Sequence, residues 1–458
     1  MRKQLFTIIP LLVGTFAFAQ SIGEAELAEI QSSFIKDPST VALQNILTGN
    51  KDIATMARNI RGDGTLDEYF KYNVSVKGIT NQKSSGRCWL FASLNDLRPT
   101  VMEKYNLKEF DFSHNFDSFW DLFEKSNLFL ENIIATADKP MDDREVETYF
   151  KSPVGDGGVW NLFINVAQKY GVVPDAVMPE TEHSDATAQM RGVLNERLRA
   201  GGWELRQMKI SGASLKNMRV QKIEILKEIY RILALCLGEP PVEFSWRYKD
   251  AAGQVHTLKT TPKEFYKSIV PEVFDYTNQI MVMNDPTREY YKVYDIANYR
   301  NTYEGFNWIY LNLPMDDIKR MALQSIKDDD PMYISCDVGK FLIRDKGILD
   351  LNNFDYQSLF GIKIDMDKKA RILTRQSGST HAMLLVACDT DENDVPVKWK
   401  FENSWGKNSG KGGYIYLTDE WFDAYLFRIV IDRKYLDDKA LKALKSKPEQ
   451  LPVWDYMN

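Results

Sequence analysis

Apolar residues recur at helical spacing along much of the first two thirds of the chain. The clearest case follows residue 88, where four apolar residues share one helix face at i, i+4, i+7 and i+11: Leu90, Leu94, Leu97 and Val101. This run predicts a helix that starts close to residue 88. Pro99 lies inside it and predicts a bend or an end of the first segment, because proline lacks the N–H of an interior helical position.

Similar spacing predicts helices in three other parts of the chain. Residues 20–75 contain two apolar runs and are expected to form a helical arm, which could be a propeptide or a packing element. Residues 110–130 carry aromatic side chains at a spacing that most often marks a buried face. Residues 186–200 and 214–235 alternate acidic and basic residues, which is typical of solvated helices.

From residue 331 the pattern changes to that of strands. Four short runs have the composition expected of strands: residues 332–336, 381–388, 396–401 and 413–417. Residues 436–444 return to helical spacing, and an extended tail then runs to Asn458.

Composition places the chain among ordinary globular proteins. It has 458 residues, of which 44% are hydrophobic and 27% are charged, and this length allows two or three domains. The net charge is −6 and no block of Lys or Arg stands out, so no nucleic-acid partner is expected. Four histidines and four cysteines are scattered without the spacing of metal ligands, so neither a metal site nor a cofactor is expected.

The first residues predict a signal peptide over residues 1–19. Arg2 and Lys3 form a positive segment, residues 5–16 are apolar, and Ala17-Phe18-Ala19 offers a cleavage site between small residues. A membrane anchor is the weaker interpretation, because the apolar run is shorter than the ~20 residues that span a bilayer. No later run is long and apolar enough either, so we expect an exported protein, periplasmic or secreted, without a membrane partner.

Export would place three further cysteines in an oxidising compartment, where a disulfide among Cys236, Cys336 and Cys388 becomes possible. Three cysteines cannot all pair, and Cys336 and Cys388 lie in expected strands. We therefore expect free, buried thiols.

The candidate chemistry centres on one cysteine at the expected helix start. Polar and glycine-bearing residues from Gln82 to Arg87 lead into Cys88 and Trp89. A thiol at a helix N-terminus lies at the positive end of the helix dipole, which favours the thiolate and lowers its pKa. Gln82 can donate a side-chain N–H beside a reacting carbonyl. Taken alone, however, a Cys-Trp pair more often marks a buried structural cysteine.

Two residues of the C-terminal half complete a catalytic set. His381 opens an expected strand, and Asn403 follows 22 residues later (403 − 381 = 22) in an Asn-Ser-Trp-Gly segment. Histidine can take the proton of a cysteine nucleophile and return it to a leaving amine, and the asparagine can hold the imidazole in one tautomer. Trp405 can shield that hydrogen bond from water. With Gln82 and Cys88, these residues predict a Cys-His-Asn site with an oxyanion donor.

This set resembles the papain superfamily of cysteine peptidases and, within it, the bleomycin hydrolase/aminopeptidase C family. Cys88 and His381 are 293 residues apart (381 − 88 = 293), against ~130–150 in a plain papain-like domain, which leaves ~150 additional residues. That family carries a helical insertion of this kind. Other stretches also match it: Phe112-Ser113, Asp156-Gly157-Gly158, Asn284-Asp285-Pro286, Cys336 to Lys340, Thr418 to Phe422 and Leu451 to Met457. The resemblance covers residues 65–458.

The resemblance implies an α+β fold: a papain-like two-lobed core, with a helical lobe and a β-barrel-like lobe, a large helical insertion and a C-terminal tail in the cleft. Six segments are expected in order. A signal peptide (residues 1–19) and an N-terminal helical arm (20–75) precede the catalytic helix lobe with Cys88 (76–130). The insertion (131–330), the β-rich lobe with His381 and Asn403 (331–435), and a C-terminal helix with the active-site tail (436–458) follow.

The resemblance also implies a role for each site residue. Cys88 is the nucleophile and His381 the acid/base, paired as thiolate and imidazolium. Asn403 orients His381, and Gln82 binds the oxyanion together with the Cys88 backbone N–H. Trp89 and Trp405 support the site. The family forms hexameric barrels whose C-terminal carboxylate receives the substrate's α-amino group, which makes its members aminopeptidases of broad specificity acting on peptides.

Two features depart from the family pattern. Its members are mostly cytosolic, whereas the export signal here implies periplasmic or secreted peptide substrates. The family tail usually continues beyond the Trp-Asp-x-Met segment, whereas here Met457 is followed only by Asn458. Because an extended chain covers ~3.3–3.6 Å per residue, the loss of about three residues withdraws the carboxylate by ~10 Å. We expect an enzyme that prefers free N-termini but also releases short peptides or cuts internally.

Two other classes of protein fit parts of the pattern. One is an acyl-transfer or amide-hydrolysing enzyme on the same scaffold, although the glutamine before the cysteine and the Asn-Ser-Trp-Gly segment favour a peptidase. The other is a non-catalytic peptide-binding protein, which the complete catalytic set argues against. Glycine clusters at residues 155–158 and 406–411 resemble phosphate-binding loops only weakly, because their spacing does not match such motifs.

Overall fold

The computed structural model describes residues 21–60, 66–270 and 278–457, so the expected signal peptide and Asn458 lie outside the described residues. Contacts divide the chain into two compact units, Met1–Arg58 and Asn59–Asn458.

The first unit contains three helices, α1 (Glu24–Ser32), α2 (Pro38–Thr48) and α3 (Ile53–Ala57). Asp37 and Asp52 begin α2 and α3 by accepting hydrogen bonds from backbone N–H groups of the first turn. No side chain of α1 or α2 is buried, and several large apolar ones are exposed: Leu27, Ile30, Val41 and Ile46.

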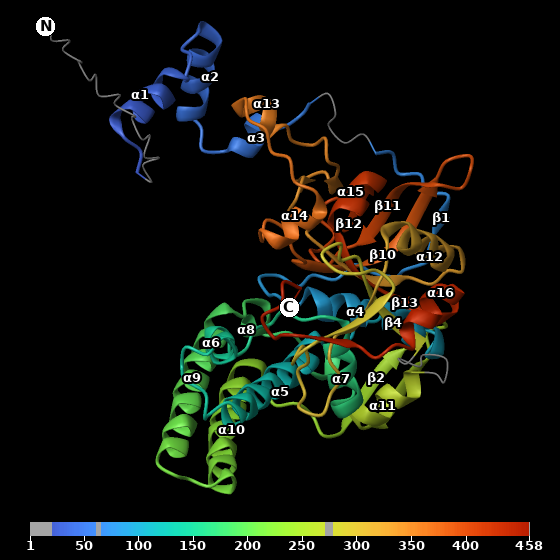
Figure 1. Ribbon diagram of the computed structural model, residues 1–458. Coiled ribbons are helices and arrows are strands. Elements are labelled where there is room, and N and C mark those ends of the chain that lie inside the picture. The colour runs from blue at the N-terminus through green and yellow to red at the C-terminus, as the bar shows by residue number, and fades with distance from the viewer. Residues whose placement is uncertain (1–20, 61–65, 271–277, 458) are drawn as a thin grey trace, which may run out of the picture. The chain divides into compact units, whose positions relative to one another are not determined.

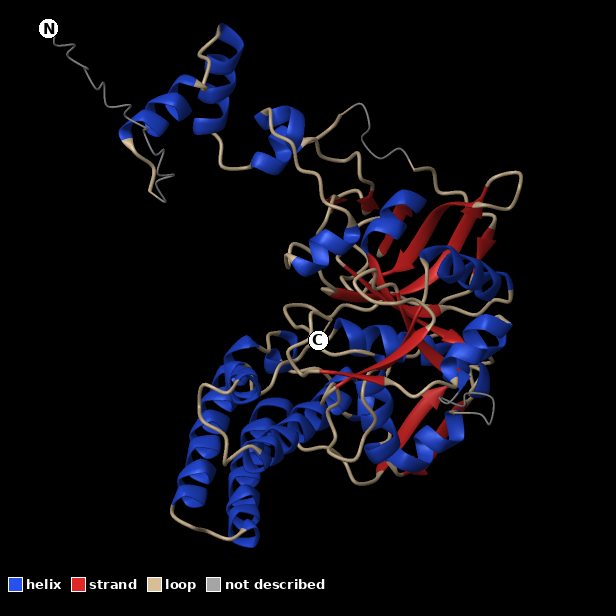
Figure 2. Ribbon diagram, viewed as in Figure 1, coloured by secondary structure: helices blue, strands red, loops and turns tan. Residues whose placement is uncertain are grey.

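The second unit is built on a sheet of twelve strands (Figure 2). Eleven follow one another in the order β14 (Glu449–Leu451), β5 (Lys292–Ile296), β6 (Ile309–Asn312), β4 (Gln279–Met283), β13 (Leu426–Asp432), β7 (Met332–Cys336), β10 (His381–Thr390), β11 (Pro396–Glu402), β12 (Tyr414–Thr418), β9 (Ile348–Leu349) and β8 (Leu342–Ile343). The twelfth, β1 (Tyr72–Asn73), pairs with β10. Strands β2 (Phe244–Lys249) and β3 (Val255–Thr260) form a separate antiparallel pair.

Strand β10 is the centre of this sheet. Its first eight residues, from His381 to Cys388, are all buried. Such a continuous apolar run is typical of a strand that is covered on both faces. Helix α4 (Cys88–Lys104) packs on β10, which brings the start of the helix and the start of the strand into one region. The four strands that the sequence predicts correspond to β7, β10, β11 and β12.

The helices of the second unit lie on both sides of the strands (Figure 1). Helices α5 (His114–Ala135), α9 (Ala188–Ile210) and α10 (Leu215–Leu237) contact one another, and α7 (Trp160–Tyr170) packs on α5 and α4. Shorter helices are α6 (Arg144–Lys151), α8 (Glu182–Asp185), α11 (Pro262–Ile269), α12 (Met315–Lys327), α13 (Tyr356–Phe360), α14 (Lys368–Leu373), α15 (Asp419–Tyr425) and α16 (Asp438–Leu444), with 3-10 turns at Asp175–Val177 and Arg433–Tyr435. The fold is α+β, as expected.

Helix α4 continues through Pro99 to Lys104, so the proline does not end its first segment. The apolar face predicted from the sequence is buried on both sides of the proline, with Leu97 before it and Val101 after it. Packing of this face outweighs the lost backbone hydrogen bond.

The expected helical insertion over residues 131–330 is helical only in part. Its helices end with α11 at Ile269, apart from α12. Strands β4, β5 and β6 lie in the same range and join the central sheet next to β13. The part of this range from Gln279 to Asn312 therefore contributes three strands to the sheet that also contains β10.

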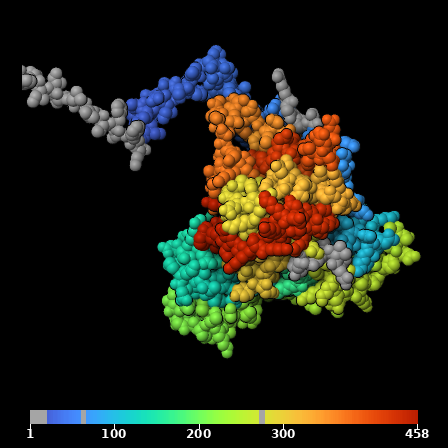
Figure 3. Space-filling model, turned by 45° about the vertical axis from the view of Figure 1, so that its right-hand side comes forward, coloured from blue at the N-terminus to red at the C-terminus, as the bar shows by residue number. Residues whose placement is uncertain are grey.

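The C-terminal tail lies on the surface of the second unit. Figure 3 shows the end of the chain, in red, running across one face between the teal helices and the yellow and orange segments. Strand β14 pairs in parallel with β5, which fixes the start of the tail. Farther along, Asp455 pairs with Arg288, and the Met457 carbonyl accepts a hydrogen bond from Arg428.

Candidate active site

Cys88 is the first residue of α4, as the sequence predicts. The segment before it is held by the chain around it. Gln82 N donates to the Ser404 carbonyl at 2.9 Å, and Gly86 N donates to Asp156 Oδ2 at 2.6 Å. A Cβ at position 86 would lie 2.6 Å from the Asp156 carboxylate, so only glycine allows this close approach. The loop therefore presents Cys88 from a fixed backbone.

His381 is held in one orientation at the start of β10. Its Nε2 lies 2.8 Å from Asn403 Oδ1, and both residues are buried. The Ser404 backbone N–H also donates to Asn403 Oδ1, at 2.8 Å, which fixes this atom as the acceptor. The imidazole hydrogen is therefore on Nε2, and Nδ1 keeps its lone pair.

Trp405 covers the His381 and Asn403 pair. Its ring centroid lies 4.8 Å from that of His381, with an angle of 32° between the planes. The guanidinium of Arg344 also lies over this ring, 4.2 Å from the centroid. The indole thus limits the access of water to the hydrogen bond, as expected from the sequence.

The helix and the strand meet at one cavity of about 460 Å³. The Ala382 backbone N–H donates to Cys88 Sγ at 3.4 Å, which places the thiol beside the residue that follows His381. Gln82, Cys88 and His381 all line this cavity. The structure therefore brings together residues that lie far apart in the sequence.

Burial shifts both titratable groups toward their neutral forms. It raises the pKa of the half-buried Cys88 to about 11, and the Ala382 hydrogen bond only partly opposes this. It lowers the pKa of His381 to about 4, against the hydrogen bond that the ring donates to Asn403 Oδ1, which favours the charged ring. Burial therefore moves the thiol pKa in the direction opposite to the lowering that the sequence predicted for a cysteine at a helix start. Transfer of the Cys88 proton to His381 would leave the net charge of these two residues unchanged.

The Gln82 side chain is fixed at both ends of its amide. Ser404 Oγ donates to Gln82 Oε1 at 2.7 Å, and Gln82 Nε2 donates to the Ser85 carbonyl at 2.6 Å. One Nε2 hydrogen remains for another acceptor. The backbone N–H of Cys88 belongs to the first turn of α4, where N–H groups have no partner within the helix. Two donors can therefore face one oxygen atom near Cys88.

Trp89 packs behind the nucleophile rather than in front of it. Its indole is 1% exposed and donates from Nε1 to the Asp156 carbonyl at 2.8 Å. A Cβ at Gly158 would lie 2.7 Å from the Trp89 ring, so the 156–158 segment passes directly over the indole. Trp89 thus links helix α4 to the cavity wall.

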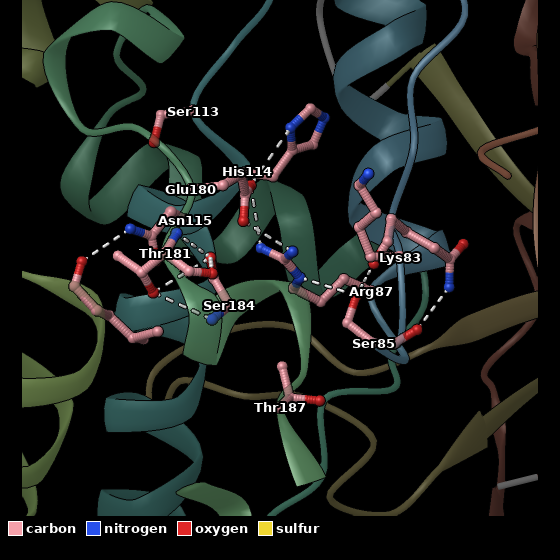
Figure 4. A network of polar contacts seen from close by, with 12 residues as sticks. Lys83, Ser85, Arg87, Ser113, His114, Asn115, Glu180, Thr181, Ser184 and Thr187 are labelled. Carbon is pink, nitrogen blue, oxygen red and sulfur yellow. Dashed lines mark hydrogen bonds and ion pairs between the residues drawn. The ribbon is translucent and has the colours of Figure 1, made fainter. Parts of the chain in front are cut away.

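Arg87 anchors the same loop from the opposite side (Figure 4). The guanidinium donates to both carboxylate oxygens of Glu180, at 3.2 and 2.9 Å, and its Nε donates to Ser85 Oγ at 3.1 Å. Arg87 is 1% exposed. His114 Nδ1 lies 3.9 Å from Glu180, but burial lowers the pKa of His114 well below its usual value, so this contact joins a neutral ring to the carboxylate.

Several residues that line the cavity were not assigned to the site from sequence. Asp156, Gly157 and Gly158 appeared only as part of the family resemblance and as a weak glycine cluster. Other lining residues carried no sequence signal, since the fold alone brings them there: Tyr299, Ser335, Ser379, Thr380 and Arg428.

The tail approaches this cavity. Met457 is 2% exposed, and its carbonyl accepts a hydrogen bond from Arg428, which lines the cavity. The Met457 N–H donates to Asp455 Oδ1 at 3.0 Å. Asn458, the other residue expected at the tail, lies outside the described residues.

All four cysteines are free. Cys336 and Cys388 are buried, as expected, whereas Cys236 is half-buried. In the described parts of the chain, no group of three His, Cys, Asp or Glu side chains is placed to hold a metal ion. No helix of those parts has the length and apolar character needed to cross a membrane.

Comparison with known proteins gives consistent matches over most of the chain. A model of the Peptidase C1-like family matches residues 21–458. The chain is 37% identical over 433 residues to bleomycin hydrolase of Mus musculus, covering 92% of this chain and 94% of that protein. It is 36% identical over 437 residues to aminopeptidase C of Lactobacillus delbrueckii subsp. lactis, covering 94% and 96%. The crystal structure of pepW from Lactobacillus rhamnosis HN001 has a TM-score of 0.91 and 35% identity, covering 96% and 99%.

Proposed function

Since the chain belongs to the Peptidase C1-like family and is a papain-like cysteine peptidase, we propose that it is an exported aminopeptidase of broad specificity that also releases short peptides. Cys88 is the nucleophile, His381 the acid/base and Asn403 the residue that orients it, with Gln82 in the oxyanion hole. The observation that carries the proposal is the His381–Asn403 hydrogen bond of 2.8 Å in the cavity that contains the Cys88 thiol.

The reaction follows from the protonation states of the pair. The Cys88 thiol proton passes to Nδ1 of His381 as Sγ forms a bond to the substrate carbonyl carbon. The carbonyl electron pair moves to its oxygen, which accepts hydrogen bonds from Gln82 Nε2 and the Cys88 N–H. When the C–N bond breaks, the leaving amine takes the proton from His381. Water then attacks the thioester, giving up a proton to His381, which returns it to the Cys88 sulfur.

The release of short peptides is supported by the size of the cavity. Its volume of about 460 Å³ falls in the range of about 300–1,000 Å³ that holds whole small ligands. This gives room for more than one amino-acid residue beside Cys88. Arg428 of the cavity wall binds the Met457 carbonyl, and a tail held this close to the cavity favours substrates with a free N-terminus.

Hydrolysis of matched peptides tests this activity. Wild-type protein is expected to release single residues and short peptides from free peptides, and to cleave N-acetylated versions more slowly. Cys88→Ala is expected to abolish both reactions and the labelling of the thiol by iodoacetamide. Release of single residues only, with no cleavage of any acetylated peptide, would contradict the proposed release of short peptides. Transfer of the acyl group to an added amine in place of water would favour an acyl-transfer enzyme.

The proposal that the protein is exported rests on the sequence of residues 1–19 alone. The mature protein then begins at Gln20 and acts on periplasmic or secreted peptides. Cell fractionation with N-terminal sequencing tests this point. Protein that keeps Met1 and stays in the cytoplasm would contradict it.

Assembly as a homohexamer is the proposed quaternary state. Apolar side chains are exposed on helix α1, such as Ile30, and directly after it, such as Phe34, and an apolar surface of this kind suits contact with another chain. Light scattering is expected to give about six times the chain mass. Ile30→Asp with Phe34→Asp is expected to lower this mass, and a wild-type monomer would contradict the proposal.

A further inference from the structure

Arg428 brings a positive charge to the wall of the active-site cavity. Strand β13 pairs with β7 so that Arg428 lies opposite Ser335, and both residues line the cavity with Cys88 and His381. Arg428 is only 4% exposed. A cation buried to this extent normally has a carboxylate partner, because an unpaired buried charge is costly.

Among the described residues, Arg428 has no such partner. Its Nη2 donates to the Met457 carbonyl, and its Cζ lies 5.4 Å from the ring centroids of both Tyr299 and Trp308. These rings hold the guanidinium in place by cation–π contact. Its Nε is buried and makes no hydrogen bond within the described residues.

A neighbouring arginine shows the usual solution. Arg288 also contacts the tail, and it pairs with two carboxylates, those of Asp285 and Asp455. The contrast indicates that the tail region of this fold can neutralise a buried guanidinium with its own carboxylates. At Arg428 it offers a backbone carbonyl and two rings instead.

Among the described residues, the charges of the cavity wall do not balance. Asp156 is the lining residue with the opposite charge, and its carboxylate already binds Gly86 N, Thr187 Oγ1 and Arg191. Its negative charge is compensated within the wall, whereas no carboxylate of the described residues, which end at Met457, pairs with Arg428.

Hydroxyl groups beside Arg428 add hydrogen-bond donors. Ser335 Oγ accepts a hydrogen bond from Ser379 at 2.8 Å, so its own O–H can donate elsewhere. A carboxylate only accepts hydrogen bonds, and it would satisfy the free Arg428 N–H groups and the Ser335 hydroxyl, which both line the cavity.

We propose that Arg428 forms an anion subsite that binds an Asp or Glu side chain of the peptide substrate close to the scissile bond. The inference rests on the proposed peptidase function and adds a substrate preference to it. The cleaved bond and the chemistry are unchanged, and the acidic side chain adds binding energy in the cavity.

Peptides that differ at one position test the subsite. Each set places Glu, Gln or Lys at one position on either side of the scissile bond, and kcat/KM is measured for each peptide. At one position, wild-type protein is expected to favour Glu over Gln by about tenfold or more, since hydrogen bonds to charged groups are the stronger ones. Arg428→Gln is expected to remove this preference, mainly through KM, and Arg428→Glu to favour Lys.

Arg375 provides the matched control. Its guanidinium lies 5.0 Å from the Tyr456 ring, so it also contacts the tail, but it does not line the cavity. Arg375→Gln is expected to keep the wild-type ratio of Glu to Gln cleavage. Wild-type protein without a Glu preference at any position would overturn the subsite. Arg428 variants could instead cleave N-acetylated peptides faster while they keep the wild-type ratio of Glu to Gln cleavage. This result would also overturn the subsite, because Arg428 would then only anchor the tail.

Binding to catalytically inactive protein gives a second measurement that needs no Arg428 variant. Cys88→Ala protein is titrated calorimetrically with the Glu and Gln peptides. Tighter binding of the Glu peptide, by a margin that shrinks at high salt, supports the subsite, and equal affinity overturns it. Failure of the proposed peptidase function would give a different result from failure of the subsite: wild-type protein would hydrolyse none of the peptides.

Discussion

At the scale of single residues, the active site depends on which imidazole nitrogen is free. Asn403 accepts the hydrogen on His381 Nε2, so Nδ1 can take the Cys88 proton. Sequence motifs predicted a role for each of these three residues, because each lies in a short segment with its own signature, and the structure brings them together. The protonation of the pair was not predictable in this way, because burial depends on the whole surrounding structure.

The pH dependence of activity follows from the lowered pKa of His381. Because burial brings this pKa from 6.5 to about 4, the ring stays able to accept a proton down to that pH. The value of kcat/KM for an aminoacyl-amidomethylcoumarin is therefore expected to hold between about pH 6 and 5 and to fall as the pH drops through about 4. Protein fluorescence at each pH checks that the enzyme stays folded. A fall in kcat/KM near the ordinary histidine pKa of about 6.5 would instead show that His381 is hydrated.

Removal of the Arg87 partner is expected to destabilise the protein. Glu180→Gln leaves the buried guanidinium without a full charge partner, which costs about 3–5 kcal/mol for a fully buried pair and less here, because Glu180 is 25% exposed at its side chain. Urea unfolding measures the change. The exposed Lys227–Glu224 pair is the control, and Glu224→Gln is expected to change the free energy of unfolding by less than about 0.5 kcal/mol. Equal effects of the two substitutions would contradict the role of the Arg87–Glu180 pair.

At the scale of elements, apolar periodicity predicted those with long regular runs. Helix α4 and strand β10 were identified in this way, although α4 continues through Pro99. Strand β13 was missed because Arg428 interrupts its apolar run, and the short strands β4 to β6 lie in a stretch of mixed composition. Arg428 enters the site only through the pairing of β13 with β7, and no local sequence signal reports such a register.

The contact between the 156–158 segment and helix α4 can be tested with one methyl group. In Gly158→Ala the new Cβ would lie 2.7 Å from the Trp89 ring, so the ring or the segment must move. We expect a loss of about 1–3 kcal/mol in the free energy of unfolding, as for other overpacked sites, together with a lower kcat/KM. Gly155→Ala is the control, because a methyl group added there would have no atom within 4 Å. A Gly158→Ala protein as stable and active as Gly155→Ala would show that this packing is loose.

At the scale of the whole molecule, the tail and the catalytic residues come from distant parts of the chain. Strand β14 joins the tail to one edge of the sheet, and Arg428 on β13 holds its Met457 carbonyl at the cavity. The family resemblance predicted a tail in the cleft. Its anchoring residues could not be predicted, because the Arg288–Asp455 pair spans 167 positions.

Release of the tail is expected to widen the range of substrates. Asp455 binds both Arg288 and the Met457 N–H, so Asp455→Ala removes two contacts that fix the tail. We expect faster cleavage of N-acetylated peptides relative to free peptides, by several-fold. Glu449→Gln is the control, because it weakens only the exposed ion pair with Lys292 at the start of the tail. An unchanged ratio in Asp455→Ala would show that the tail does not limit the substrate.

The separation of Cys88 from His381 also determines when the site forms during synthesis. The ribosome completes α4 early, but β10 begins 293 residues after Cys88 (381 − 88 = 293), and β13 and the tail follow it. A nascent chain therefore carries a thiol without its base for most of its synthesis. Because the imidazole joins the thiol only when the central sheet closes, an unfinished chain has no assembled Cys88–His381 pair of its own.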